Sequence, residues 1–179
     1  MTAQCPSGNL LAIDPGDEGD HPVSTLAYYA AGHLVGLAEY NTQTAQITML
    51  AGTLVKPDLI AIEKPRIYPN GHPRPQNIVN LAWAGGQALL AARLAYGCTF
   101  REYEPRAWKG QVKKPPHHHR FWQVLAAPER LLFPNDTYAR IHAACQALGR
   151  TGKVEKYSWR WHNALDAAAL GAFVLGRTK

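Results

Sequence analysis

The stretch Asn9–Gly16 reads NLLAIDPG, a short apolar run that ends in an acid and is followed at once by Pro and Gly. Such a run predicts a buried β-strand, and the Pro-Gly pair predicts the turn that ends it. A second run of this kind, Leu59–Glu63 (LIAIE), also ends in an acid. Because ligands of α/β sheets bind at strand ends, Asp14 and Glu63 are candidate site residues. The alternative is that each acid only caps a turn or meets a lysine.

The runs around these two strands predict one α/β domain over residues 1–179. The order is three strands first and then alternating helices and strands, which favours a mixed five-stranded sheet flanked by helices. The further strands are expected at Val23–Tyr29, His33–Tyr40 and Thr99–Tyr103, and the helices at Thr42–Val55, Asn77–Tyr96, His117–Leu125, Asp136–Leu148 and Asn163–Leu175.

A third acid, Asp166, lies within the segment HNALDAAALGAFVLGR, which is apolar on nearly every side of the predicted helix. Most of that helix should therefore be buried. The alternative role of this acid is a favourable contact with the helix dipole. His162 and Asn163 lie four and three residues earlier, so they share a face with Asp166. Three acids on rigid elements suit a two-metal phosphodiesterase, with Mg²⁺ as the ion and Mn²⁺ as a substitute.

The composition fits a polyanionic partner. The chain has 19 Lys and Arg against 13 Asp and Glu, a net charge of +6 and a pI near 9.3. Its three cysteines form no C-x-x-C pair, which excludes the usual zinc and redox motifs and indicates reduced thiols. We find no apolar run long enough to span a membrane and no signal peptide, so we expect a cytoplasmic protein.

Two basic segments with aromatic residues are candidates for DNA contact. The first is the proline-rich stretch KPRIYPNGHPRP (64–75), for which an incidentally charged surface loop is the alternative. The second, residues 106–120, includes three consecutive histidines; consecutive side chains do not point one way, so phosphate contact is favoured over a metal site. Trp159 and Trp161 could extend this surface or pack in the core. The predicted DNA-binding residues are Lys64, Arg66, Tyr68, Arg74, Lys109, Lys113, Lys114 and Arg120.

The motifs IDPG with Asp14, IAIEKP with Glu63 and HNALDAAALG with Asp166 resemble, in order and element type, the acidic motifs of the RuvC family of Holliday-junction resolvases. That family has the ribonuclease H-like fold. The similarity spans roughly Leu10–Gly176. The pieces EPRAWKGQVKKPPHHHR and HNALDAAALGAFVLGR are similar in particular to the short RuvC-like resolvases of bacteriophages.

This resemblance implies a homodimer that binds four-way DNA junctions and makes paired, metal-dependent nicks, leaving 5′-phosphate and 3′-hydroxyl ends, in a bacterial or phage-infected cell. It also implies that the three acids are metal ligands. The family's fourth ligand lies three residues before the last Asp, where this chain has Asn163. We favour His162 for that role, because a neutral imidazole can bind Mn²⁺. Asn163 could instead cap the helix, with His162 as a surface residue. The candidate dimer interface is the helix near Trp83–Ala92.

Other functions remain open. A related nuclease could cut flaps or other branched DNA with the same acids, and a non-catalytic junction-binding protein could share the fold. A sugar-kinase or actin-like ATPase is disfavoured, because the chain is too short for two such domains. It also lacks the glycine-rich phosphate-binding motifs.

Overall fold

The computed structural model describes residues 8–16, 23–65, 75–152, 157, 159 and 161–178. Its strands are β1 (Leu10–Asp14), β2 (Val23–Ala30), β3 (His33–Asn41), β4 (Gln46–Gly52), β5 (Leu59–Glu63) and β6 (Thr99–Tyr103). Its helices are α1 (Pro75–Tyr96), α2 (Pro105–Trp108), α3 (Lys114–Val124), α4 (Ala127–Arg130), α5 (Thr137–Thr151) and α6 (Trp161–Val174).

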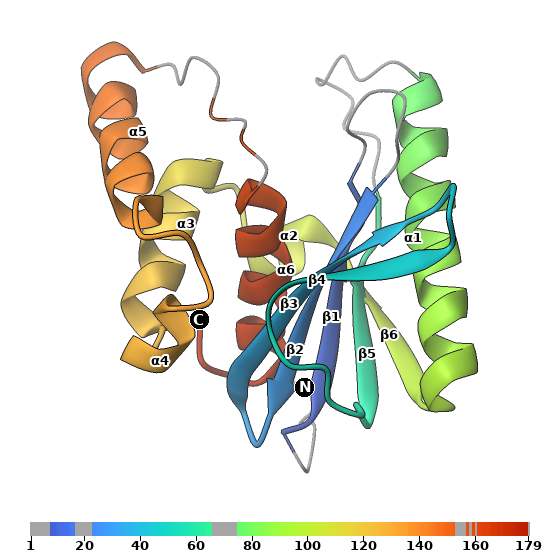
Figure 1. Ribbon diagram of the computed structural model, residues 1–179. Helices are drawn as coiled ribbons and strands as arrows, with labels where there is room; N and C mark the ends of the chain where they lie inside the picture. Colours follow the sequence, from blue (N-terminus) through green and yellow to red (C-terminus); the bar gives the residue numbers. More distant parts are fainter. Residues whose placement is uncertain are drawn as a thin grey trace.

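The strands form one mixed six-stranded sheet in the order β4-β3-β2-β1-β5-β6 (Figure 1). β1 to β4 pair antiparallel in succession, whereas β5 and β6 run parallel to β1. This is the mixed, helix-flanked α/β sheet that the sequence predicts, with one strand more than expected. Parallel pairing places the carboxyl ends of β1 and β5, and with them Asp14 and Glu63, at the same edge of the sheet.

Helices cover both faces of the sheet (Figure 1). α6 packs on β1 and β2, with α3 and α5 outside it, and α1 covers the opposite face. Two glycines permit close approach on either side. A Cβ at Gly171 would overlap the ring of Tyr29, and a Cβ at Gly85 would lie 2.8 Å from the side chain of Pro15. α1 therefore packs directly against the turn that follows Asp14.

The predicted helix at Thr42–Val55 is wrong, because Gln46–Gly52 forms the edge strand β4. Local turn chemistry decides the difference. The side-chain oxygen of Asn41 accepts hydrogen bonds from the backbone N–H groups of Gln43 (2.9 Å) and Thr44 (3.2 Å). This arrangement reverses the chain directly after β3. The spacing of apolar residues after the turn was compatible with a helix, but the turn makes the segment pair with β3 instead.

Burial within α1 and the start of α6 complete the fold. In α1, Leu90 is 59% exposed, while Ala84, Ala88 and Ala92 are buried. In α6, the helix begins at Trp161, so Asn163 lies inside the first turn and is not the cap residue. Trp161 and the preceding Trp159 pack against the core, which settles their placement. No helix among the described residues is long and apolar enough to cross a membrane.

Candidate metal centre

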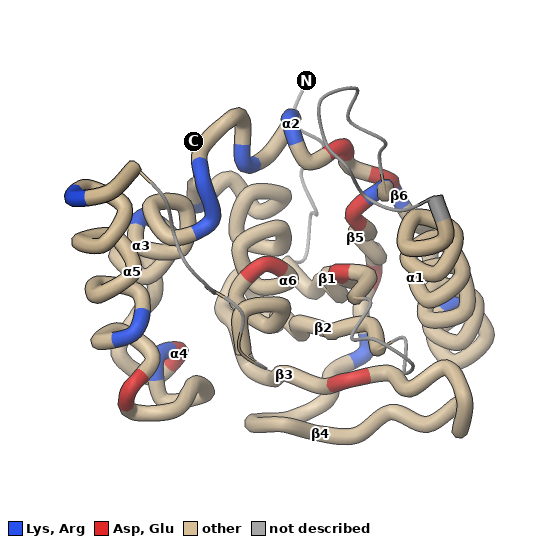
Figure 2. Tube along the Cα trace, turned by 90° about the horizontal axis from the view of Figure 1, so that it is seen from above, with Lys and Arg blue, Asp and Glu red and all other residues tan. Residues whose placement is uncertain are grey.

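Three acids from distant parts of the sequence gather at one end of the sheet. Asp14 ends β1, Glu63 ends β5, and Asp166 lies in the second turn of α6. Figure 2, seen from above, shows acidic positions on β1, β5 and α6 around the middle of the molecule. Asp14 is 6% and Asp166 1% exposed. The pKa of Asp14 is raised well above its usual value by burial and then by the charges of Asp166 and Glu63. The three carboxylates thus interact electrostatically.

Glu63 is paired with a lysine from the segment after β6. The Nζ atom of Lys109 donates to Glu63 Oε2 at 3.0 Å and lies 4.7 Å from the ring centre of Trp108, which is buried. Burial raises the pKa of Glu63, and Lys109 only partly offsets this effect. Burial by itself would lower the pKa of Lys109, but Asp166, Glu63 and Asp14 outweigh it and raise that pKa above its usual value. Lys109 is therefore a charged member of the acid cluster.

Asp166 is held between two side chains of α3. Lys114 Nζ lies 2.7 Å from its Oδ2, and His118 Nε2 lies 3.0 Å from its Oδ1. Burial raises the pKa of Asp166, but His118 and Lys114 outweigh burial and hold the pKa well below its usual value. Asp166 is therefore a carboxylate, whereas protonation of Asp14 is favoured. The spacing of four residues between Lys114 and His118 places both on one helix face.

The acids of the centre are suitable ligands for a divalent metal ion, although their side chains are not yet close enough together to coordinate one. Among the described residues, no three His, Cys, Asp or Glu side chains are grouped closely enough to hold an ion as they stand. Lys109 and Lys114 contact two of the acids instead. The chemistry nevertheless suits Mg²⁺, which prefers carboxylate oxygens. An added cation would also relieve the mutual repulsion that contributes to the raised pKa of Asp14.

His162 and Asn163 lie differently within the first turn of α6. His162 Nδ1 lies 2.6 Å from the carbonyl oxygen of Trp159, which can only accept, so Nδ1 carries the proton and Nε2 keeps its lone pair. Burial lowers the pKa of His162, which favours the neutral imidazole. Asn163 is buried, and its Nδ2 atom would lie 3.1 Å from a Cβ at Gly16. Asn163 therefore packs against the turn after Asp14.

The predicted DNA-binding residues fall into different places. Lys109 and Lys114 point at the acids, so they belong to the candidate centre. Lys113 donates to the carbonyl of Gly152 at 2.8 Å and is exposed, and Arg120 is exposed as well. Lys64 forms an exposed ion pair with Glu102 at 3.4 Å. The remaining three, Arg66, Tyr68 and Arg74, lie outside the described residues.

His118 is a residue of the centre that the sequence did not single out. It was treated as one of three consecutive histidines facing DNA, but it is fully buried and contacts Asp166. The signal available in the sequence was its spacing from Lys114, which places a cation and an imidazole on one face of a helix. Nothing in the sequence indicated that this face meets α6.

The comparisons with known proteins find likeness in structure alone. The sequence matches no protein-family model and no curated protein. The structure is similar to RuvC of Thermus thermophilus in complex with a Holliday junction substrate, with 16% identity over 94% of each chain and a TM-score of 0.43. A second Thermus thermophilus RuvC structure has 16% identity, covers 94% of this chain and 95% of that chain, and has a TM-score of 0.38.

The yeast mitochondrial Holliday junction resolvase is similar over 98% of this chain and 80% of its own, with 12% identity and a TM-score of 0.45. At these identities and TM-scores, structural likeness supports no statement about activity, since one fold hosts many functions. The function has to be argued from the residues of the site.

Proposed function

We propose that this chain is a metal-dependent endonuclease of the RuvC type that resolves four-way DNA junctions by paired nicks. One observation carries the proposal: Asp14, Glu63 and Asp166 come from three separate elements and gather at one end of the sheet, at the cost of burying like charges together. Folding alone does not call for such an arrangement, and perturbed carboxylates in one place are typical of functional sites. The three motifs that resemble the RuvC family supply the reaction class.

In this proposal Asp14, Glu63 and Asp166 would hold Mg²⁺, and His162 would be the fourth group through Nε2, the ring nitrogen that does not face the Trp159 carbonyl. When bound, the metal would activate water for attack on a phosphodiester and leave 5′-phosphate and 3′-hydroxyl ends. Lys109 and Lys114 neutralise Glu63 and Asp166 while the acids hold no other cation. Once a metal ion replaces them there, their ammonium groups would be available to contact a DNA phosphate beside the site.

The basic surface that would hold DNA lies on the segment from α2 to α5. Residues 105–152 carry eight Lys or Arg against two acids, so this segment alone has the net charge of +6 that the whole chain has. Figure 2 shows basic positions along α3 and α5, beside the acidic end of the sheet. Because α3 carries both the basic side chains and two contacts to Asp166, DNA held by this segment would lie next to the acids.

Two coordinated nicks require two active sites, and an exposed apolar stripe on α1 favours a second copy of this chain as the partner. The stripe consists of Val79, Trp83, Leu90 and Leu94, which are all exposed, Leu94 by 79%. The intervals of four and seven residues keep these side chains on one face of the helix, as in a helix pair. Sedimentation should show a dimer at micromolar concentration, and a monomer for Trp83→Glu together with Leu90→Glu.

The decisive experiment is incubation with a labelled four-way junction, a flap and a linear duplex, in Mg²⁺ or Ca²⁺. We expect symmetrical nicks in the junction in Mg²⁺. Asp14→Asn, Glu63→Gln and Asp166→Asn should each abolish nicking and leave junction binding intact. His162→Ala should lower the rate at least about tenfold, more in Mg²⁺ than in Mn²⁺. Asn163→Ala, one position along the same turn, is the matched control.

The other outcomes point to the alternatives. Preferential cutting of the flap would indicate a branched-DNA nuclease of different selectivity. Junction binding without nicking in any metal would indicate a non-catalytic binding protein. Near-normal nicking by one of the acid variants would remove that acid from the centre, and a dead Asn163 variant with an active His162 variant would exchange those two roles.

A further inference from the structure

His118 has both of its ring nitrogens engaged inside the protein. Its Nε2 lies 3.0 Å from Asp166 Oδ1, and its Nδ1 lies 2.8 Å from the hydroxyl of Tyr157. The side chain of His118 is fully buried. A chain of three polar groups, Tyr157, His118 and Asp166, therefore runs from the segment before α6 through α3 to the acid centre.

The neighbouring histidines do not share this arrangement. The ring of His117 packs against Trp108 with centroids 5.0 Å apart, and the ring of His119 lies 5.9 Å from that of Tyr138. Successive side chains of a helix point in different directions, so one of the three histidines reaches the acid while the others face elsewhere. His119 is thus a natural control for any experiment on His118.

The chemistry of the partners assigns the roles in this chain. Asp166 is a carboxylate and accepts, so Nε2 of His118 carries a proton and donates to Oδ1. On the other side of the ring, Nδ1 is hydrogen-bonded to the Tyr157 hydroxyl. The second oxygen of Asp166, Oδ2, contacts Lys114, whose side chain is 43% exposed. Oδ1 is therefore held by a fully buried ring, whereas Oδ2 contacts a side chain that is partly exposed.

We propose that His118, itself oriented by Tyr157, is a positioning residue that fixes the Asp166 carboxylate so that Oδ2 is presented to the metal. This inference rests on the proposed function, because it assigns Asp166 as a ligand. His118 does not bind the metal in this proposal. It restricts the Asp166 carboxylate, which could otherwise rotate, to one orientation. Partners of this kind typically change metal affinity by about 10–100-fold when they are removed.

The test is Mn²⁺ binding to the DNA-free protein, measured by calorimetry or electron paramagnetic resonance, with thermal unfolding measured in parallel. His118→Ala should bind Mn²⁺ about 10–100-fold more weakly. His118→Gln should recover most of that loss, because its amide can donate to Oδ1 in place of Nε2. Tyr157→Phe should weaken binding by a few fold, and His119→Ala should bind as the wild type does. In nicking assays the His118→Ala defect should shrink as the Mg²⁺ concentration is raised.

Wild-type Mn²⁺ affinity in folded His118→Ala, or a defect that His118→Gln does not recover, would overturn the inference. If His118→Ala does not fold, Tyr157→Phe decides: wild-type affinity in that variant overturns the proposal, and weaker binding with unchanged unfolding supports it. Asp166→Asn separates this result from the proposed function. Retained Mn²⁺ binding in Asp166→Asn would refute the metal centre itself. Loss of Mn²⁺ binding in Asp166→Asn, together with wild-type Mn²⁺ affinity in the His118 and Tyr157 variants, would refute the positioning role alone.

Discussion

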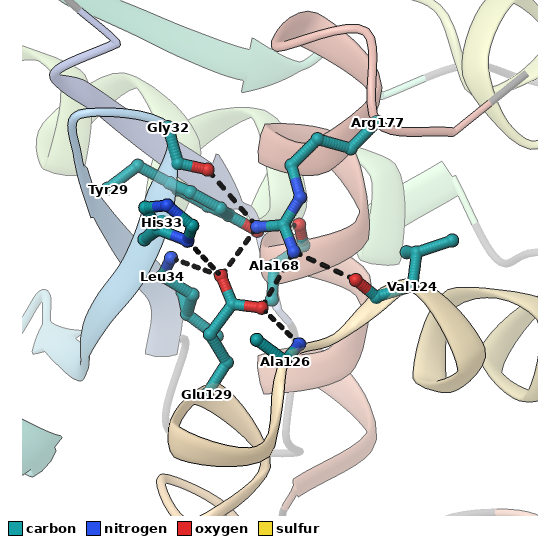
Figure 3. A network of polar contacts seen from close by, with 9 residues as sticks. All are labelled: Tyr29, Gly32, His33, Leu34, Val124, Ala126, Glu129, Ala168 and Arg177. Atoms are coloured by element: carbon teal, nitrogen blue, oxygen red, sulfur yellow. Dashed lines mark hydrogen bonds and ion pairs between the residues drawn. The ribbon is translucent and has the colours of Figure 1, made fainter.

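Two clusters of buried charged residues lie at opposite ends of the sheet. They differ in how many hydrogen bonds and ion pairs their carboxylates receive. In the first, Glu129 accepts from the backbone N–H groups of Leu34 (2.8 Å) and Ala126 (2.6 Å) and forms a two-pronged pair with Arg177 (Figure 3). In the second, at the candidate metal centre, Asp14 is also buried, yet among the described residues its carboxylate has no hydrogen bond or ion pair, and the charges of Lys114 and Lys109 only partly offset its burial.

The pKa values follow this difference. Burial would raise the pKa of Glu129, but Arg177 and the two backbone donors outweigh it and lower that pKa below its usual value. The pKa of Asp14 is raised, because burial and the neighbouring acids act in the same direction. A buried carboxylate whose oxygens all accept hydrogen bonds stabilises the fold. A buried carboxylate whose pKa is raised by burial and by like charges is typical of a ligand-binding site. The Glu129 cluster therefore has a structural role, and the cluster around Asp14 is the candidate functional site.

The largest expected effect is on the Glu129 cluster. Arg177 also donates to the carbonyl oxygens of Gly32 (3.1 Å) and Val124 (2.9 Å), so it joins the β2–β3 turn, the end of α3 and the end of α6. Arg177→Met should lower the free energy of unfolding by about 3–5 kcal/mol, because it leaves a buried carboxylate without its cation. Urea titration measures this loss. The same variant, kept at a temperature where it is folded, should bind Mn²⁺ normally; a loss below about 1 kcal/mol would show that the pair is peripheral.

The next largest effect is on thermal stability, and it has opposite signs for Asp14 and Asp166 of the candidate centre. A carboxyl whose pKa is raised by folding destabilises the folded protein as pH rises above its ordinary pKa. In metal-free protein at neutral pH, Asp14→Asn should therefore raise the unfolding midpoint, by about 2–4 °C for each 1 kcal/mol gained. Asp166 has a lowered pKa, so its stabilisation is present above the ordinary pKa and is lost as pH falls through the lowered value. Asp166→Asn should lower the midpoint.

Calorimetric scans in a chelator at pH 7 and near pH 4 check both signs. The advantage of Asp14→Asn should disappear at the lower pH, because both forms of the site then carry a neutral group at that position. A destabilised Asp14→Asn variant at pH 7 would mean that Asp14 has a structural partner and that the contrast with Glu129 does not hold.

The sequence predicted the parts of this fold that depend on short-range patterns. The strands ending in Asp14 and Glu63 were recognisable because uninterrupted apolar runs indicate strands buried on both faces. The segment Gln46–Gly52 was not, because the side chain of Asn41, a single turn residue, decides between a helix and an edge strand. In α1, which is apolar on several sides, the pattern could not show that the small residues face the sheet.

The candidate site was predictable in its acids and not in their partners. Each acid stood out locally, as the last residue of an apolar strand or as a lone charge in an apolar helix. The contacts of Lys114 and His118 with Asp166 cross 52 and 48 positions of sequence and depend on how α3 packs beside α6. Such pairings are tertiary, so the sequence could indicate that the segment is basic but not which of its cations turn inward.

The smallest expected effect concerns the basic surface, and it sharpens the distinction between inward and outward cations. Lys113 is exposed at the end of α3 next to the acids, whereas the adjacent Lys114 is engaged with Asp166. If Lys113 contacts one DNA phosphate, Lys113→Ala should reduce the slope of log affinity against log salt by about 0.9. The loss of junction affinity between 50 and 200 mM salt should then be about three- to four-fold smaller than in the wild type.

Lys56 is the matched control, because it lies just before β5, at the opposite end of that strand from Glu63. Lys56→Ala should leave the slope unchanged. Fluorescence anisotropy with a labelled junction in Ca²⁺ gives both slopes without cleavage. Equal slopes for the wild type and Lys113→Ala would show that this lysine faces away from DNA, and a reduced slope in both variants would mean that the basic surface is not confined to the segment from α2 to α5.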